Sequence, residues 1–207
     1  MSTQDPKVFT VGHSKHPLDK FVALLQRHSV TAVADVRSLP QSRFNPQFNK
    51  GSLERSLRDV SIRYVFLGRE LGARSNDPSC YEKGRVQYDR LARTDAFRDG
   101  IDRVLREANE HRICLMCAEK EPLECHRTLL VARALEAAGA KIAHIHADGR
   151  LEAHGDALER LLNLTGLPRD DLFRSREELL AKALTLQAKR VAFVDPKLAA
   201  EAREGAQ

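Results

Sequence analysis

The stretch ICLMCAEKEPLECHR, Ile113–Arg127, decides the fold. Its first part, Ile113–Ala118, is apolar throughout, which is typical of a central parallel strand that helices cover on both faces. A polar turn follows, and then a strong helical pattern over Thr128–Ala138 that Gly139 ends. This strand–turn–helix unit predicts a parallel α/β sheet.

Further short β-rich runs lie on both sides of this unit, at Val8–Val11, Ala32–Arg37, Ile62–Leu67 and Lys141–His146. Apolar residues at helical spacing separate them, over 18–25, 53–60 and 88–108, with long polar loops over 38–50 and 68–85. The alternation predicts a three-layer α/β/α fold with a mostly parallel sheet of about five strands. Helical patterns at 154–162 and 175–189 predict a C-terminal helical extension. We therefore expect one domain over 1–207, with its α/β core at 1–150 and the extension at 151–207.

Composition narrows the class of protein. The chain has 207 residues, of which 42% are hydrophobic and 30% charged, as in ordinary globular proteins. No stretch approaches the roughly 20 apolar residues of a membrane span, and the first residues lack a secretory signal pattern. We expect a cytoplasmic protein without a membrane partner. Four cysteines are too few for a disulfide scaffold, so they are expected to be buried thiols, ligands or reactive groups.

Polar side chains follow every predicted strand at its carboxyl end. They are His13 and Ser14 after the first strand, Asp35 and Arg37 after the second, Glu70 after the third, Cys117, Glu119 and Lys120 after the fourth, and His146 after the fifth. In open parallel sheets, ligands bind in the crevice beyond these strand ends. The sequence therefore predicts one functional site at this edge of the sheet.

The turn after the fourth strand carries the densest chemistry. Cys125, His126 and Arg127 fall close to the start of the next helix, where unpaired backbone N–H groups favour anions and lower the pKa of a thiol. The functional interpretation is a reactive thiolate or an anion-binding cradle. The structural alternative is a buried Cys125 where helix meets sheet, with His126 and Arg127 bonded to neighbouring backbone.

The cysteine spacing argues against a metal site. Cys117 and Cys125 are eight residues apart, unlike the tight Cys pairs of most structural zinc sites. Cys114 and Cys117 lie within one strand, where side chains three apart point to opposite faces. From spacing we therefore assign no metal ligands, and the sequence indicates no particular cofactor.

The loop after the second strand and two strand-end residues are further candidates. Arg43 could bind a phosphate or carboxylate, Asn45 could add an amide contact and Phe48 could stack on a ligand. The alternative is an ordered connector with local turns. Asp35 and Arg37, two apart on one strand face, favour a structural ion pair when considered alone.

Taken as an ordered set, these motifs resemble a bacterial family catalogued as domain of unknown function 488, and the resemblance covers nearly the whole chain. They are TVGHS at 10–14, DVR at 35–37, PQSRFNPQFN at 40–49, ELG at 70–72, CAEKEPLECHR at 117–127 and DLFRSREE at 171–178. The resemblance implies that Cys117, Glu119, Cys125, His126 and Arg127 form one motif, joined by His13, Asp35, Arg37, Arg43 and Asn45 from two others. The family has no settled activity.

Our leading hypothesis is an enzyme acting on a phosphate-containing or nucleobase-like substrate. The expected catalytic residues are Cys117, Cys125, His13 and Glu119, and the expected substrate-binding residues are Ser14, Asp35, Arg37, Arg43, Asn45, Phe48, Lys120, His126 and Arg127. A net charge of +5 fits an anionic small molecule or a nucleic acid as partner. The alternatives are a nucleic-acid or nucleotide binding module without catalysis and a metal-dependent enzyme.

Overall fold

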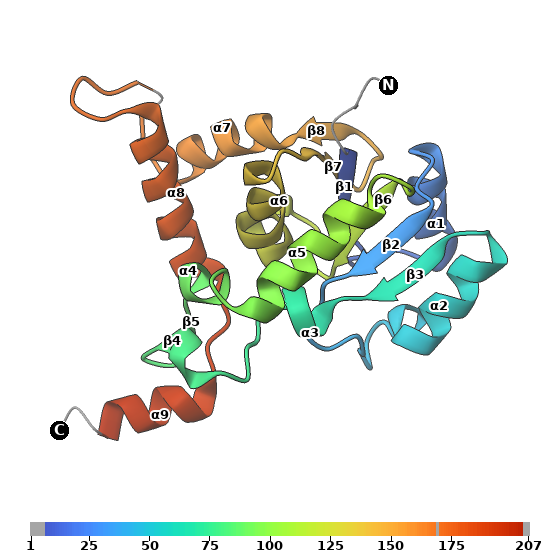
Figure 1. Ribbon diagram of the computed structural model, residues 1–207, viewed down its shortest axis with the longest axis horizontal. Coiled ribbons are helices and arrows are strands. Elements are labelled where there is room, and N and C mark those ends of the chain that lie inside the picture. The colour runs from blue at the N-terminus through green and yellow to red at the C-terminus, as the bar shows by residue number, and fades with distance from the viewer. Residues whose placement is uncertain (1–6, 169, 205–207) are drawn as a thin grey trace.

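A computed structural model describes residues 7–168 and 170–204 (Figure 1). Its centre is a six-stranded sheet in the order β3-β2-β6-β1-β7-β8. The strands are β1 (Lys7–Gly12), β2 (Ala32–Asp35), β3 (Arg63–Phe66), β6 (Ile113–Cys117), β7 (Lys141–Ile145) and β8 (Leu151–Ala153). All neighbours are parallel except β7 and β8. The mostly parallel sheet predicted from the sequence is confirmed.

The apolar strand β6 lies at the middle of the sheet, between β2 and β1. Its alternate side chains enter two separate cores, because Cys114 packs on one face and Cys117 on the other. Helices α1 (Leu18–Arg27) and α2 (Lys50–Asp59) bury Phe21, Leu53 and Leu57 in the first core. Helix α5 (Asp95–Glu107), the helix after β6 and α7 (His154–Leu164) cover the other face. These layers are the expected α/β/α arrangement.

The C-terminal extension differs from the expectation at its start. Residues 151–153 form β8, an edge strand that pairs antiparallel with β7, and only Glu152 of the three is buried. A three-residue strand with one buried polar residue has no apolar pattern for sequence reading to detect. Helix α8 (Arg176–Val191) begins at a capping box formed by Ser175 and Glu178, and α9 (Pro196–Glu204) follows. Figure 1 places α7 and α8 together at one side of the sheet and α1 and α2 at the other.

The regions predicted as long loops contain short elements. They are η1 (Pro46–Phe48), α3 (Gly68–Leu71), η2 (Pro78–Cys80), β4 (Tyr81–Glu82) and β5 (Arg85–Val86), with η3 (Pro122–Glu124) in the turn after β6. The predicted helix at 88–108 divides into α4 (Tyr88–Leu91) and α5, because the Thr94 hydroxyl accepts a hydrogen bond from Phe97 N and starts a new helix. The helix after β6 opens as a π-helical stretch, Arg127–Ala132, and continues as α6 (Arg133–Ala137).

None of the helices in the described part of the chain combines the length and apolarity that crossing a membrane requires.

Candidate functional site

The turn after β6 folds back so that two cysteines and a histidine meet. The Sγ atoms of Cys117 and Cys125 each lie 3.8 Å from Nδ1 of His126. The three possible ligand atoms lie within 4.8 Å of one another, and all three residues are buried. Cys117 ends β6 and His126 begins the next helix, so an element end fixes each side of the cluster. The spacing of eight residues between the two cysteines argued against a shared site, but this turn brings them together. These residues could hold a metal ion.

The orientation of His126 is set from outside the cluster. Its Nε2 lies 3.0 Å from the carbonyl oxygen of Val36, and a carbonyl only accepts, so Nε2 carries the proton. In the neutral ring, the lone pair on Nδ1 therefore faces both sulfurs. A backbone carbonyl on the far nitrogen is the arrangement that metal-ligating histidines commonly show.

Arg127 holds the turn from beneath. Its Nη1 donates to the carbonyl oxygen of Glu119 at 2.7 Å and its Nη2 to that of Lys120 at 3.4 Å. Its backbone N–H donates to the Cys125 sulfur at 3.4 Å. The guanidinium, although fully buried, is thus bonded to backbone carbonyls. Arg127 therefore positions the turn. This is the structural alternative given above, and not the binding of a substrate anion.

Glu119 lies beside the cluster on the side of Cys125. The Cys125 Sγ lies 2.9 Å from Glu119 Oε2, close enough for the two groups to share a proton. A carboxylate and a thiolate do not approach this closely without a proton between them. Accordingly, burial and the neighbouring Cys125 raise the pKa of Glu119.

The pKa values of the two thiols are shifted in opposite directions. The hydrogen bond to Cys125, together with burial, raises the pKa of Cys117. Burial alone would raise the pKa of Cys125, but the hydrogen bond from Cys117 and the charge of Arg127 lower it well below the ordinary value. Burial likewise opposes protonation of His126, yet its contact with Cys125 raises the pKa of the ring. Negative charge in the cluster is therefore favoured on Cys125.

A buried ion pair forms the adjoining wall. Arg37 binds Asp35 through two bonds, Nε to Oδ1 at 2.9 Å and Nη2 to Oδ2 at 2.6 Å. The Tyr64 hydroxyl donates to the same carboxylate at 2.7 Å. Asp35 is therefore fully engaged within the protein, as the ion-pair interpretation of these two residues predicts.

His13 belongs to this wall and not to the thiol cluster. Its Nδ1 donates to the carbonyl oxygen of Ser14 at 2.9 Å, and its Nε2 accepts from Arg37 Nη1 at 3.2 Å. Burial lowers the pKa of His13 to about 4. With both ring nitrogens occupied, the expected role of His13 in proton transfer has no free atom to perform it.

A cavity of about 260 Å³ opens over the cluster. Of the residues predicted from the sequence, it is lined by Arg37, Cys117, Glu119, Cys125 and His126. The lining also includes residues that sequence reasoning missed, namely Ser38, Leu39, Ala73, Arg74, Tyr88, Ala118, Glu124, Val191 and Phe193. Most of these lie in loops or in the C-terminal extension, where no strand end signalled them.

The other predicted residues do not line this cavity; they are His13, Ser14, Asp35, Arg43, Asn45, Phe48, Lys120 and Arg127. Phe48 is fully buried and stacks on His13 with ring centroids 4.3 Å apart, so it is a core residue and not a ligand platform. Arg43 is exposed and packs over its neighbour Phe44. Arg37, Arg43 and Arg127 are therefore not brought together as a common anion cradle.

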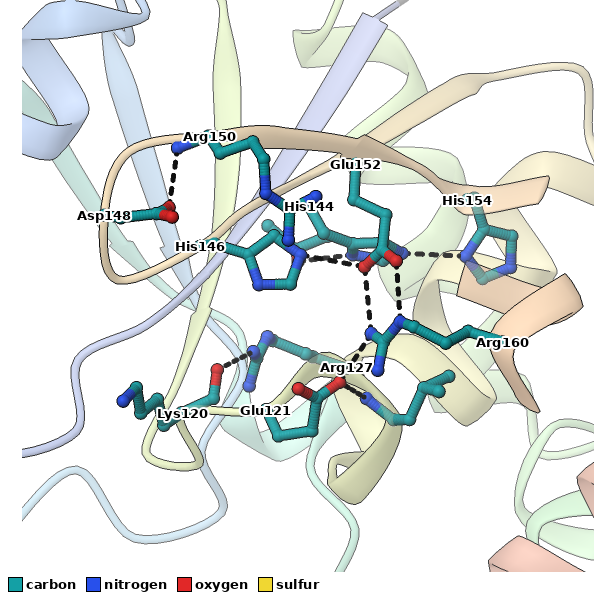
Figure 2. A network of polar contacts seen from close by, with 12 residues as sticks. Lys120, Glu121, Arg127, His144, His146, Asp148, Arg150, Glu152, His154 and Arg160 are labelled. Carbon is teal, nitrogen blue, oxygen red and sulfur yellow. Dashed lines mark hydrogen bonds and ion pairs between the residues drawn. The ribbon is translucent and has the colours of Figure 1, made fainter. Parts of the chain in front are cut away.

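A second polar network supports the turn from the side of β7 and β8 (Figure 2). Arg160 binds Glu152 with Nε 2.8 Å from Oε1 and reaches Glu121, in the turn itself, with Nη2 2.7 Å from Oε1. His144 Nε2 lies 3.0 Å from His154 Nδ1. Burial lowers the pKa of these rings, that of His144 to about 3 and that of His154 to about 4. The network links the sheet edge and α7 to the turn that carries the cluster.

Comparison with known proteins identifies the family of the chain. A family model described as "Domain of unknown function DUF488" matches residues 17–134, which is more than half of the chain. The match contains Asp35, Arg37 and the whole turn from Cys117 to Arg127. No curated protein and no solved structure matches the chain. The chain belongs to the DUF488 family.

Proposed function

We propose that the protein is a metal-dependent enzyme, with a zinc-type ion held by Cys117, Cys125 and His126. The observation that carries the proposal is the spacing of the three ligand atoms. Zinc–sulfur and zinc–nitrogen bonds of about 2.3 and 2.0 Å place a sulfur and a nitrogen about 3.5 Å apart, and two sulfurs about 3.8 Å apart, on a tetrahedron. The two sulfur–nitrogen distances here are both 3.8 Å. Both distances exceed the sulfur–nitrogen separation on such a tetrahedron by only about 0.3 Å, which supports the proposal because a small adjustment of the side chains would fit the ion.

The number of ligands favours a catalytic site over a structural one. Structural zinc sites are usually closed by four protein ligands, whereas catalytic sites use three and keep one position for water or substrate. Cys117, Cys125 and His126 form a set of three, and all of them line the cavity of about 260 Å³. The hydrogen bond from His126 Nε2 to Val36 supplies the outer support that orients a ligand ring.

The chain's own residues fit hydrolysis of a small polar substrate. A bound zinc ion would supply Lewis acidity at the floor of the cavity. Because the ion would take the place of the proton between Cys125 and Glu119, the Glu119 carboxylate, which lines the cavity, can accept a proton from water as the water oxygen bonds to the substrate. The same proton then passes to the leaving group, which completes the addition of water across the broken bond. Arg37 keeps one Nη1 hydrogen free of Asp35 and His13 for a polar substrate group.

Two other hypotheses have less support. A phosphate cradle at the cluster itself needs converging arginines, and the cavity over the cluster instead combines Arg37 and Arg74 with Glu119 and Glu124. A nucleic-acid module without chemistry leaves the buried Cys–Cys–His cluster without a purpose. A nucleophilic Cys125 uses the same atoms as the metal site, so the metal content distinguishes the two forms of enzyme.

Elemental analysis of the purified chain tests the proposal. We expect about one zinc-type ion per chain, lost in Cys125→Ser and in His126→Gln. Cys80→Ala is the matched control, because Cys80 is also a buried free cysteine but is not part of the cluster. A folded wild-type chain without stoichiometric metal, after supplementation with zinc, contradicts the proposal. If alkylation of Cys125 blocks ligand binding in such a chain, the hypothesis of a nucleophilic Cys125 replaces the metal site.

A further inference from the structure

A second, larger cavity adjoins the first. Its volume is about 900 Å³, within the range of about 300–1,000 Å³ that is usual for small-molecule sites. The two cavities share Ser38, Leu39, Arg74 and Phe193 in their linings, so one ligand can extend from one into the other. The first cavity alone is too small to enclose more than the reacting end of such a ligand.

The second cavity contains a carboxylate oxygen without a partner. Glu70 lines this cavity, and its Oε2 is buried without a hydrogen bond. A buried unsatisfied acceptor costs about 1–3 kcal/mol and is rare in native proteins. No group of the described chain donates to this oxygen, and a small shift of the Glu70 side chain toward the cavity would bring it to a donor on a bound ligand.

Close backbone packing holds Glu70 in place. It lies on α3, and a Cβ added at Gly68 of this helix would lie 1.9 Å from the carbonyl oxygen of Arg37. A Cβ at Gly100 on α5 would lie 2.8 Å from the Cβ of Glu70. The short helix is thus fitted between the site wall and α5, so Glu70 cannot easily turn away to find another partner.

The remaining lining combines aromatic rings with charges of both signs. Asp77 and Asp195 also line the cavity, but each accepts from backbone N–H groups of the chain. Phe66, Tyr81 and Phe193 contribute aromatic rings. The Tyr81 hydroxyl already donates to the Ser75 carbonyl oxygen, so this side chain offers its ring and not its polar end. Arg69 and Arg74 are exposed at the cavity, and the Arg74 guanidinium lies 4.4 Å from the Phe193 ring centroid. Aromatic faces with nearby guanidinium groups are the usual means of holding a base and a phosphate.

We propose that the second cavity binds the amino-bearing base of a nucleotide substrate, with Glu70 accepting a hydrogen bond from the exocyclic amino group. The assignment rests on the proposed function, because the reacting end of the same nucleotide extends past Arg74 and Phe193 to the Cys117–Cys125–His126 cluster. The base is recognised by a carboxylate, and the phosphate group is held by the exposed arginines. The substrate class is therefore a nucleotide, and not a simple phosphate or an amine.

Equilibrium binding of AMP, GMP, CMP and purine riboside 5′-monophosphate tests this site. The last compound is AMP without its amino group. We expect at least one of the three amino-bearing nucleotides to bind about tenfold or more tightly than purine riboside 5′-monophosphate. Glu70→Leu keeps a similar volume without the acceptor, and should reduce this ratio to about one. In Glu110→Leu, a change at the opposite edge of the sheet, the ratio should be unchanged.

Zinc content separates failure of this site from failure of the proposed function. Glu70→Leu should retain the wild-type metal content. If the chain holds zinc but does not distinguish the four compounds, the base site is wrong and the metal-dependent enzyme stands. If a chain without metal still distinguishes them through Glu70, the base site stands alone. If Glu110→Leu and Glu70→Leu change the ratio equally, the recognition by Glu70 is overturned.

Discussion

At the scale of single residues, the site depends on side chains that support others. Arg37 contributes to the cavity only because Asp35 compensates its charge through two bonds, and both residues are almost wholly buried. Removing one member of a buried pair leaves the other charge without a partner, which costs more than the pair itself contributes. Asp35 is therefore a positioning residue for the wall of the cavity.

Asp35→Asn should destabilise the protein by about 3–5 kcal/mol, because it leaves the Arg37 guanidinium buried without its carboxylate. Urea denaturation measures this change. The matched control is Glu107→Gln, since Glu107 forms an exposed ion pair with Arg63, whose loss should cost less than about 1 kcal/mol. Equal effects of the two substitutions would mean that Arg37 is solvated despite its burial.

Acid should destabilise the fold through the buried histidines on the side of β7. The pKa of His154 is about 4 in the folded chain, against about 6.5 when it is exposed. Between these values the unfolded chain binds a proton that the folded chain does not, so the free energy of unfolding falls as pH falls from 6.5 to 4. The loss from His154 is at most about 3 kcal/mol, of which about 2 kcal/mol is reached at pH 5.

Urea denaturation at pH 7 and pH 5 measures this loss in the wild type and in His154→Gln. The variant should show the smaller difference between the two pH values. The histidines His144 and His13 remain in it, and burial lowers the pKa of both, so a reduced pH dependence in the same direction should persist. An unchanged pH dependence in His154→Gln would exclude His154 as a source.

The residue scale also shows what the sequence could and could not predict. Cys117, Glu119, Cys125 and His126 were identified because strand ends in parallel sheets meet at one edge. The contacts of His13 and Phe48 inside the protein were not predicted, because the sequence does not reveal which polar atoms are already bonded, whereas the backbone contacts of Arg127 were one of two alternatives left open. The close approach of Cys117 and Cys125 was not predicted from their spacing, since residues eight apart are brought together by a turn whose path no periodicity describes.

At the scale of elements, the site is the junction of the β1 end with the turn after β6. A Cβ added at Gly12, the last residue of β1, would lie 1.9 Å from the carbonyl oxygen of Glu119. The same carbonyl accepts from Arg127 Nη1, so the turn is held between the strand and the guanidinium. Glycine at this position is required by close approach and not by backbone angle.

Gly12→Ala should therefore displace the turn, destabilise the fold by about 1–3 kcal/mol and reduce zinc affinity. Gly155→Ala is the control, because this helical glycine has no atom within 4 Å of an added Cβ. Alanine there should stabilise the protein by up to about 1 kcal/mol through helix propensity. Thermal unfolding and zinc titration measure both effects. A Gly12→Ala chain with native zinc affinity would show that the turn tolerates displacement.

The element scale explains which parts of the fold were predictable. Strands such as β6 and helices such as α5 have long apolar patterns, and their existence was correctly predicted. The two-residue strands β4 and β5 and the three-residue β8 are too short to show a period. Each forms across a short turn, since β4 pairs with β5 and β8 with β7, and a partner distant in sequence supports the first pair, because Val86 N donates to the Phe193 carbonyl oxygen.

At the scale of the whole molecule, the C-terminal extension is part of the same core and of the same site. Leu179, Ala183 and Leu184 of α8 lie in the core that contains Leu115 and Cys117 of the sheet. The amide of Gln187 donates to the Leu123 carbonyl oxygen, in the turn that carries the cluster. Residues beyond the family match thus close the cavity, and we expect the extension and the α/β core to unfold together.

Leu179→Ala tests this unity, because Leu179 is fully buried where α8 meets the core. If the chain unfolds as one unit, the substitution should lower the free energy of the whole transition by about 2–5 kcal/mol. Circular dichroism and the labelling of Cys114, a core thiol on the opposite face of the sheet, should then report the same midpoint. Leu172→Ala is the matched control, since Leu172 is 96% exposed and its truncation should change stability by less than about 0.5 kcal/mol. Two separated transitions, with Cys114 protected after α8 has melted, would instead mean that the extension is an independent unit and that the cavity can open without loss of the sheet.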